Sequence, residues 1–539
     1  MAPPEINPGS NMSDGLSGIR DSKVSSWPDV RNPASLRCKR KASDQTLDEH
    51  ADPENPDFFL ENFDVEKKTR KIMAQESFPR QRFGRPCDSF DKYCDPANPV
   101  IVRGEQILDA THRIKSGIIR TPCNYSKMSR TLGLDLYLKK DYLQVTGSFK
   151  ERGARYALIK LNKDQRMKGV ISTSAGNHAQ ALAYHGRDLG IPVTVCMPKI
   201  APLVKVESCR EMGAEVILYG DSFDETRDHA MKISAERDLT YINGFDHPDV
   251  IAGQGSVGVE ILDDVPDVEY IIVPVGGGGL IAGIAKAVKH LKPDVKIIGV
   301  ESERCPSWQT RQMLGKHTKC VWSQWGAKNT IADGLAVAEV GCNAYATCND
   351  LLEKVISISE DWISIAILRL LEKEKAVTEG GGAAGVAAII ANALPELRGK
   401  KVCTVLCGGN IDASTLTRVI DRGLTAEGRI MRFTVNVQDR PGGMVEMLKI
   451  VSDVGASVKE VQHDRMLLTA FVYKVALIAT VETRGRENAQ ELVHKLKERY
   501  NDEVTFHTVS ACHYGEPTPA MLAQSADPTQ ETVSEENLG

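Results

Sequence analysis

The sequence has no apolar stretch long enough to cross a lipid bilayer. In one candidate, residues 271–288, four consecutive glycines interrupt the run and Lys286 adds a charge. A membrane-spanning helix needs about 20 predominantly apolar residues, so we predict no membrane span. The first thirty residues also lack both a secretory apolar core and an Arg-rich amphipathic pattern. We therefore expect a cytoplasmic protein.

An excess of basic charge and clustered metal ligands are absent as well. The 67 Lys and Arg residues are outnumbered by 72 Asp and Glu residues, which gives a formal net charge of −5. This balance argues against a nucleic-acid partner and favours small-molecule ligands. The 12 His residues do not cluster, and the 13 Cys residues form no Cys-x-x-Cys pair. We predict neither a disulfide framework nor a metal site.

Both ends of the chain show weak apolar periodicity. Residues 1–98 are rich in Pro, Ser, Asp, Asn and Arg, and residues 516–539 are polar. Such segments bury too little apolar surface to offset the entropy of ordering, so we expect disorder in both. Residues 39–43 (Lys-Arg-Lys-Ala-Ser) fit a nuclear-import patch, a phosphorylation site or a solvated basic run. Between the two ends we expect one domain at 99–425 and a second at 426–515.

In the first of these domains, short apolar runs alternate with segments of helical spacing. Strand-like runs occupy residues 136–138, 169–173, 193–197, 215–219, 270–275, 296–300 and 402–406. Helical segments occupy residues 104–118, 154–161, 179–189, 202–212, 224–237 and 256–262. This alternation predicts an α/β fold in which helices cover both faces of parallel sheets. In such folds ligands bind at the carboxyl ends of the strands.

Three turns that follow predicted strands carry small residues. The open backbone of residues 174–178 (Ser-Ala-Gly-Asn-His) suits a carboxylate. Residues 276–280 (Gly-Gly-Gly-Gly-Leu) leave room for a phosphate against a helix N-terminus. The third turn comprises residues 407–410 (Cys-Gly-Gly-Asn). We expect the three turns to converge on one crevice.

The glycine turn permits two other interpretations. It fits an ordinary tight turn. It also fits a dinucleotide fingerprint, because Gly277, Gly279 and Ala282 open a helix after a strand, and Glu301 ends the next strand about twenty residues later. Sequence spacing alone leaves NAD binding open.

Residues 144–154 place a lysine directly after a Gly-Ser-Phe turn and at the start of a predicted helix. The backbone confines Lys150, as is required of an amine that bonds covalently to a cofactor carbonyl. The alternative is that residues 147–148 form an N-cap turn and that Lys150 is a solvated charge in the first turn of a helix.

Four motifs together resemble the fold type II pyridoxal-phosphate enzymes, and within them the threonine dehydratases (threonine ammonia-lyases). They are residues 146–154 (Thr-Gly-Ser-Phe-Lys-Glu-Arg-Gly-Ala), 174–180 (Ser-Ala-Gly-Asn-His-Ala-Gln), 276–280 and 407–410. The resemblance covers residues 100–423. It implies two parallel-sheet α/β lobes with pyridoxal 5′-phosphate between them.

The resemblance also implies a role for each motif residue. Lys150 would carry the cofactor, Phe149 would pack on its pyridine ring, and Cys407 would face the ring nitrogen. Asn177 would hydrogen-bond the ring hydroxyl. The phosphate ligands would be Gly276, Gly277, Gly278, Gly279 and Leu280. The substrate ligands would be Ser174, Ala175, Gly176, Asn177 and His178, together with Glu379 beside the cofactor. The Gly-rich run after Glu379 is equally compatible with helix–helix packing.

The reaction that we expect is β-elimination of water from L-threonine or L-serine, giving 2-oxobutanoate or pyruvate and ammonia. The amine of Lys150 would remove the Cα proton. The thiol of Cys407 is a weaker donor to the ring nitrogen than an aspartate, which favours elimination over a long-lived carbanion.

Two positions differ from the serine racemases of the family. These usually carry a second serine where this chain has Ala175, so we expect elimination to dominate over racemisation. Their cation site would fall on Glu301, Cys305 and Ser307, where Ser307 replaces a carboxylate ligand. Because hard cations prefer more oxygen ligands than this set offers, we predict no metal.

From residue 431 the pattern changes to a βαββαβ order. Strands are predicted at residues 433–437, 458–463, 472–481 and 504–509, and helices at 444–454 and 487–500. This order predicts a ferredoxin-like unit. With residues 439–443 (Asp-Arg-Pro-Gly-Gly) it resembles an ACT domain, which implies an amino-acid effector. The alternative is that the unit only packs or dimerises. We expect a homo-oligomer.

Three alternatives to the lyase hypothesis are a serine racemase-like enzyme, an NAD-dependent dehydrogenase, and a catalytically silent amino-acid sensor on the same scaffold. The presence of Lys150, Asn177 and the glycine turn argues against the sensor.

Overall fold

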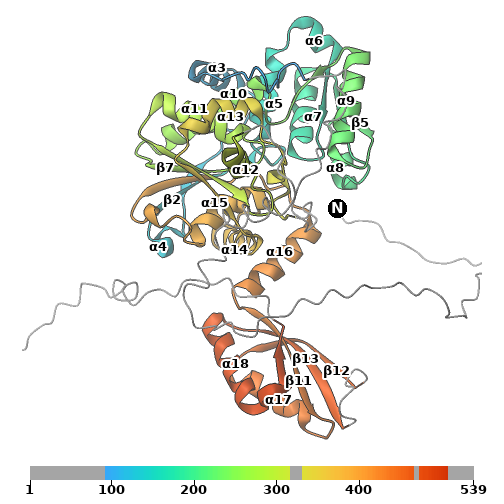
Figure 1. The fold of residues 1–539 in the computed structure, drawn as a ribbon, viewed down its shortest axis with the longest axis vertical. Coiled ribbons are helices and arrows are strands. Elements are labelled where there is room, and N and C mark those ends of the chain that lie inside the picture. Colours follow the sequence, from blue (N-terminus) through green and yellow to red (C-terminus); the bar gives the residue numbers. More distant parts are fainter. Residues whose placement is uncertain (1–90, 316–329, 466–472, 508–539) are drawn as a thin grey trace, which may run out of the picture. The chain divides into compact units, whose positions relative to one another are not determined.

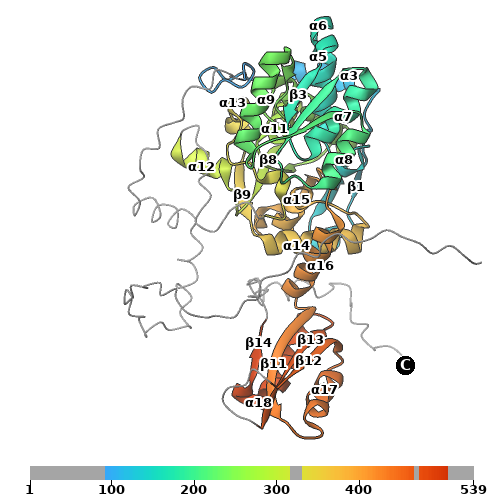
Figure 2. The same cartoon turned by 90° about the vertical axis from the view of Figure 1, so that its right-hand side faces the viewer.

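The computed structural model describes residues 91–315, 330–465 and 473–507. Figures 1 and 2 show these ranges in two views. Within them, no helix is long and apolar enough to span a membrane. The predictions for residues 1–98, including the basic run at 39–43, and for residues 516–539 lie outside the described residues, except at 91–98.

A six-stranded sheet forms the centre of the larger lobe (Figure 1). In spatial order its strands are β1 (Cys123–Tyr125), β2 (Asp135–Lys139), β10 (Lys401–Val405), β7 (Tyr270–Pro274), β8 (Lys296–Ser302) and β9 (Lys354–Ile358). Neighbouring strands run parallel, except that β1 is antiparallel to β2. Along β7, Ile271 and Val273 face one layer of helices and Ile272 faces the other, as alternation along a strand requires.

Helices cover both faces of this sheet. One layer comprises α3 (Gly104–Ile114), α10 (Pro248–Asp264), α11 (Gly279–Leu291) and α13 (Cys342–Cys348). The other comprises α14 (Glu360–Arg369), α15 (Gly380–Ile390) and α16 (Ala413–Ala426). Shorter elements are α4 (Ser129–Leu132), α12 (Ser307–Leu314), η1 (Asp141–Leu143), η2 (Asp333–Leu335), η3 (Asn349–Leu351), η4 (Leu370–Glu374) and η5 (Pro395–Leu397).

The smaller lobe is built on a four-stranded parallel sheet. Its strands, in spatial order, are β5 (Glu215–Leu218), β4 (Val193–Met197), β3 (Val170–Thr173) and β6 (Thr240–Tyr241). One face packs against α5 (Lys150–Lys160), α7 (Asn177–Leu189) and α8 (Leu203–Glu211), and the other packs against α9 (Phe223–Arg237). The short α6 (Lys163–Lys168) follows α5. The predicted α/β fold with two parallel-sheet lobes is confirmed.

Helix α10 is longer than the sequence pattern predicted. Its apolar spacing indicated residues 256–262, whereas the helix begins at Pro248 and ends at Asp264. Gly253 and Gly255 lowered the helical signal, yet they are the points where other helices approach closely. A Cβ on Gly253 would lie 2.5 Å from the carbonyl oxygen of Arg152, and one on Gly255 would lie 2.8 Å from that of Gly283. Tertiary packing therefore overrides the low helix propensity of glycine here.

The C-terminal unit has the predicted βαββαβ order. Its elements are β11 (Ile430–Gln438), α17 (Gly443–Asp453), β12 (Ser457–Asp464), β13 (Lys474–Glu482), α18 (Arg486–Tyr500), η6 (Asn501–Glu503) and β14 (Val504–Phe506). The four strands form an antiparallel sheet in the order β12-β13-β11-β14. Phe433, Met447, Leu477 and Leu492 bury themselves between this sheet and its two helices. This topology is ferredoxin-like.

Candidate active site around Lys150

The turn before Lys150 is held in place by the third glycine-bearing turn. Phe149 N donates to Cys407 O at 3.0 Å, Gly409 N donates to Gly147 O at 3.0 Å, and Ser148 bridges Gly408. Gly147 has a φ of 76°, which a residue with a Cβ rarely adopts. Lys150 is the first residue of α5, so its backbone is fixed by the helix on one side and by this pairing on the other.

The amine of Lys150 lies inside the site and is not a solvated surface charge. Its Nζ donates to the carbonyl oxygen of Gly244 and lies 5.2 Å from the centroid of the Phe149 ring. Burial lowers the pKa of Lys150 from its ordinary 10.5 to about 8, although Cys407 and Glu379 act in the opposite direction. A substantial fraction of neutral amine at physiological pH is what a general base requires.

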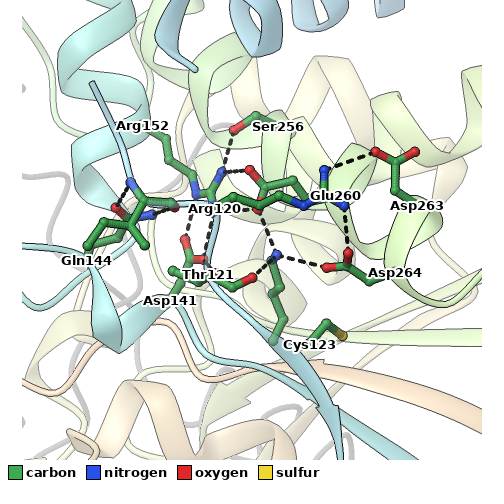
Figure 3. A network of polar contacts seen from close by, with 12 residues as sticks. Arg120, Thr121, Cys123, Asp141, Gln144, Arg152, Ser256, Glu260, Asp263 and Asp264 are labelled. Carbon is green, nitrogen blue, oxygen red and sulfur yellow. Dashed lines mark hydrogen bonds and ion pairs between the residues drawn. The ribbon is translucent and has the colours of Figure 1, made fainter. Parts of the chain in front are cut away.

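A buried network fixes the first turn of α5 two residues after Lys150 (Figure 3). Arg152 is fully buried and uses all five of its N–H groups. Nε and Nη2 donate to the two Asp141 oxygens at 2.7 and 2.9 Å. Nη1 and Nη2 donate to the two Glu260 oxygens at 2.7 and 2.8 Å, and Nη1 also donates to Ser256 Oγ at 3.1 Å. The network therefore ties α5 to both η1 and α10.

Lys139, at the end of β2, completes the network. Its Nζ donates to Thr121 O at 2.6 Å and lies 2.7 Å from a Glu260 oxygen and 3.3 Å from an Asp264 oxygen. Burial alone would raise the pKa of Asp141, but the Arg152 guanidinium, with smaller contributions from Thr121 and Lys139, holds that pKa below its ordinary value. Each charged side chain of this network has a partner of opposite charge. A buried charge without a partner would strongly destabilise the fold.

The second turn opens α7 with free backbone donors. Ser174 Oγ accepts a hydrogen bond from Gly176 N at 3.2 Å, and Gly176 precedes the helix as its N-cap. Among the described residues, the N–H groups of Ala175, Asn177 and His178 donate to no protein acceptor. Free N–H groups at a helix N-terminus suit a carboxylate.

His178 lines this site as an uncharged side chain. Its ring is buried against Gly244, and its Nε2 lies 3.4 Å from Ile242 O. Burial, followed by the nearby Lys150, lowers the pKa of His178 to about 3. Such an imidazole carries no charge at physiological pH and is no proton donor there.

The glycine turn at 276–279 forms a cradle at the start of α11. A Cβ on Gly277 would lie 2.3 Å from the Phe245 ring, and one on Gly279 would lie 2.2 Å from Phe245 O. In the described part of the chain, no N–H group from Gly276 to Leu280 donates to a protein acceptor. The buried amide of Gln254, beside Gly279, also lacks a partner there. This supply of unused donors fits a phosphate group.

Glu379 joins the second and third turns. It is the N-cap of α15, its N–H donates to Gly408 O at 3.0 Å, and both carboxylate oxygens accept from Asn177 Nδ2, at 2.9 and 3.1 Å. Burial, reinforced by Asp333, raises the pKa of Glu379 to about 7, while Asn177 and Lys205 act against this shift. Burial likewise raises the pKa of Cys407, so its thiol stays protonated.

The Gly-rich run after Glu379 packs closely, but its nearest neighbours are loop backbone and not another helix. A Cβ on Gly380 would lie 2.3 Å from Ile331 O, and one on Gly382 would lie 2.6 Å from Gly408 O.

The structure joins the sequence motifs through contacts of Lys150, Asn177 and Gly277, and it adds residues 243–247. Gly244 accepts from Lys150, and Phe245 lines the glycine cradle. Asn243 Oδ1 accepts from the backbone N–H groups of Phe245 and Asp246 at 3.0 and 2.9 Å, which closes a tight turn. The Asn-Gly dipeptide at 243–244 was the signal that marks such a turn.

The residues considered for a cation have other partners. The Glu301 oxygens accept from Trp308 N at 2.9 Å and Gln309 N at 3.1 Å, and burial raises the pKa of Glu301 to about 8. The side chains of Cys305 and Ser307 both reach Val337 O. Within the described ranges, no three His, Cys, Asp or Glu side chains group as metal ligands. The absence of a metal stays a prediction.

Comparison with known proteins identifies the group that such a site holds. A family model described as pyridoxal-phosphate dependent enzyme matches residues 114–408. The chain belongs to this family. Pyridoxal phosphate is therefore its cofactor, which decides between the two cofactors that the glycine spacing left open.

This pyridoxal-phosphate-dependent enzyme has close relatives. An L-threonine ammonia-lyase of Thermotoga maritima is 40% identical over 389 residues, covering 72% of this chain and 95% of the relative. The processed form of threonine deaminase isoform 2 from Solanum lycopersicum is similar in structure, with 33% identity and a TM-score of 0.56 over 61% of this chain and 98% of that one. Maize serine racemase is 31% identical, with a TM-score of 0.56 over 60% and 98% of the two chains.

Proposed function

We propose that this pyridoxal-phosphate enzyme is an L-threonine and L-serine ammonia-lyase, which eliminates water and releases 2-oxobutanoate or pyruvate with ammonia. The observation that carries the proposal is the partly buried Lys150 amine, which donates to Gly244 O and has a pKa of about 8 that suits proton abstraction. It lies beside a substrate loop whose position 175 is an alanine. The 40% identity to L-threonine ammonia-lyases of two bacteria supports the same activity.

In this proposal each turn has its own ligand. The N–H groups from Gly276 to Leu280 hold the cofactor phosphate, and those of Ala175, Asn177 and His178 hold the substrate carboxylate. Phe149 would pack on the cofactor ring, and the Asn177 amide would donate to the ring oxygen. The thiol of Cys407, which burial keeps protonated, would be a weak donor to the ring nitrogen.

The chemistry divides between the cofactor and the chain. When bound, pyridoxal phosphate supplies an electron sink that weakens the bonds at the Cα atom of an amino acid. The neutral amine of Lys150 accepts the Cα proton from its own side of the substrate. Ala175 has no proton to return to Cα from the other side, and His178 is already neutral with a pKa of about 3. The arrangement therefore favours loss of the β-hydroxyl over inversion at Cα.

The activity is tested by measuring oxo-acid formation from L-threonine, L-serine and D-serine. We expect 2-oxobutanoate from L-threonine and pyruvate from L-serine, and neither product from the Lys150→Ala variant. Lys163→Ala is the matched control, because Lys163 is an exposed lysine on α6, and it retains the activity. A cofactor-loaded wild type that forms no oxo acid would refute the lyase and support a silent sensor.

The loop position is tested separately. We expect the wild type to form little D-serine from L-serine, and the Ala175→Ser variant to form more of it relative to pyruvate, because the new hydroxyl can return a proton. An unchanged ratio of D-serine to pyruvate in Ala175→Ser would contradict the role given to this position.

We further propose that residues 426–515 form an ACT-type regulatory domain that binds an amino acid. A cavity of about 510 Å³ opens in this unit, and its lining includes Asp439, Arg440, His463 and Arg465. The Arg465 guanidinium donates to both oxygens of Asp439, at 2.9 and 3.1 Å, and lowers the pKa of that carboxyl. A cation beside a carboxylate is complementary to the two charges of an amino acid.

The regulatory role predicts a rate that changes when free amino acids are added one at a time. The Arg465→Ala variant should lose this response, and Lys495→Ala, on an exposed face of α18, should keep it. A response that survives in Arg465→Ala would place the effector elsewhere.

A further inference from the structure

Asn410 ends the third turn, and its side chain touches both of the other elements that surround Lys150. Its Nδ2 donates to Thr146 O at 2.7 Å and to Asn177 Oδ1 at 2.8 Å. An amide nitrogen has two hydrogens, so these two short bonds use its donor capacity, and a third acceptor, Gln180 Oε1, lies farther away at 3.5 Å. The lysine turn, the substrate loop and the third turn are thus joined through one atom.

The lysine turn is shaped to admit this side chain. A Cβ on Gly147 would lie 2.4 Å from Asn410 Oδ1, so any larger residue at 147 would displace the asparagine. The two bonds of Nδ2 and the close approach of Gly147 to Oδ1 leave the Asn410 amide little freedom to turn.

The contacts of Asn410 determine which way the Asn177 amide points. Asn177 Oδ1 accepts from Asn410, and Asn177 Nδ2 donates to Glu379. The assignment follows from Thr146 O, a backbone carbonyl that only accepts hydrogen bonds. Asn410 must turn its Nδ2 toward this oxygen, so the Asn177 atom that meets the same Nδ2 must be the acceptor Oδ1. A flip of the Asn177 amide would set its oxygen against the Glu379 carboxylate and its nitrogen against Asn410 Nδ2.

This orientation leaves Asn177 with a spare donor. Its Nδ2 carries two hydrogens that point in diverging directions, and both of its acceptors within the described residues are oxygens of the one Glu379 carboxylate. These two oxygens lie on the same side of the nitrogen and share one of its hydrogens. The remaining N–H is available to an oxygen atom outside the protein. A flipped Asn177 would instead offer a second acceptor, which cannot bind a negatively charged oxygen.

We propose that Asn410 is a positioning residue that fixes the Asn177 amide with its N–H toward the ring oxygen of the cofactor. The inference rests on the proposed function, in which Asn177 contacts that oxygen. The Asn410 amide nitrogen contacts Thr146, Asn177 and Gln180 but none of the reacting atoms, so its influence on the cofactor passes through Asn177.

The test is a double-mutant cycle on cofactor binding. Asn410→Asp keeps the shape of the side chain but replaces Nδ2 by an oxygen, which repels Asn177 Oδ1 and releases the amide. Apoprotein is titrated with pyridoxal phosphate, and the dissociation constant and the absorption spectrum are recorded. We expect about tenfold weaker binding and a shifted visible band in Asn410→Asp. Asn177→Ala should show a similar loss.

The decisive result is the double variant. If Asn410 acts through Asn177, Asn177→Ala/Asn410→Asp binds the cofactor no more weakly than Asn177→Ala. Losses that multiply, or unchanged binding in Asn410→Asp, would overturn the proposal. Asn410→Ala in the same cycle avoids a second carboxylate beside Glu379 and serves if Asn410→Asp fails to fold.

Two controls separate this proposal from others. Asn488 lies in the C-terminal unit, where its Nδ2 donates to Val454 O at 2.8 Å. Asn488→Asp removes a comparable amide donor and should leave cofactor binding unchanged. Oxo-acid formation is not part of the readout, so a wild type that binds the cofactor but does not act on threonine would refute the lyase and still test Asn410.

Discussion

Replacing Arg152 by methionine should destabilise the catalytic domain more than any surface ion-pair change. The substitution keeps the length of the side chain but removes five N–H donors from a fully buried position. Glu260 keeps its ion pair with Lys139, whose Nζ lies 2.7 Å from a Glu260 oxygen. Asp141 loses both of its guanidinium bonds and keeps the hydroxyl of Thr121 as its side-chain donor.

The expected loss of stability follows from the Asp141 carboxylate, which stays buried after it loses its ion-pair partner. Breaking a buried ion pair by removing one partner costs about 3–5 kcal/mol. For a domain of this size, each kcal/mol of lost stability lowers the midpoint temperature of thermal unfolding by roughly 2–3 °C. We therefore expect this temperature to fall by roughly 6–15 °C. The signal to follow is the loss of the visible cofactor band on heating, because it reports the catalytic domain alone.

The loss should also depend on pH. In the wild type, Arg152 holds the pKa of Asp141 below its ordinary value, so the ion pair stabilises the fold above pH 3.8 and is lost as the pH falls through the folded-state pKa. In Arg152→Met, burial is no longer offset, and the pKa of Asp141 rises above 3.8. The difference between variant and wild type should therefore be larger at pH 8 than at pH 5.

The matched control is Arg113→Met. Arg113 pairs with Asp109 at 2.8 Å, but the two side chains are 49% and 40% exposed, and such pairs contribute little. We expect its midpoint to match the wild type. A midpoint for Arg152→Met within about 2 °C of the wild type at pH 8 would refute the reasoning about the network.

Two further predictions concern the site itself. Because the Glu379 carboxylate raises the pKa of Lys150, Glu379→Gln should move the rising limb of the kcat–pH profile to lower pH; a limb that stays in place or moves up would contradict the coupling. Gly147→Ala should weaken cofactor binding, since its Cβ would meet Asn410 at 2.4 Å, whereas Gly190→Ala, with a similar φ of 66° and no neighbour within 4 Å, should bind the cofactor like the wild type. Equal losses in these two glycine variants would mean that backbone strain alone is responsible.

The sequence predicted the turns of the site because each follows a strand. Residues 174–178 follow β3, residues 276–280 follow β7, and residues 407–410 follow β10. The rule that ligands bind at the carboxyl ends of parallel strands placed them in one crevice. The hydrogen bonds from Asn410 to Asn177 and from Phe149 to Cys407 join the second and third of these segments to each other and to the Lys150 turn. The 276–280 turn reaches the same place through Phe245, which lies against Gly277 and follows the Gly244 that accepts from Lys150.

The partners of Arg152 could not be predicted in the same way. Asp141 and Glu260 are 11 and 108 residues away from it in the chain, and no spacing rule links an arginine to such distant carboxylates. A charged residue in the first turn of a helix usually faces solvent. The α10 boundary was missed for a related reason, since Gly253 and Gly255 lower local helix propensity and gain their purpose from helices that pack against them.

The account depends most on Lys150 as the residue that holds the cofactor. Treating the loaded enzyme with borohydride makes the bond between lysine and cofactor permanent, and mass spectrometry of the digested protein then locates it. We predict the added cofactor mass on the peptide that contains Lys150, and no added mass in the Lys150→Ala variant. Attachment to a different lysine of the wild type would contradict the account.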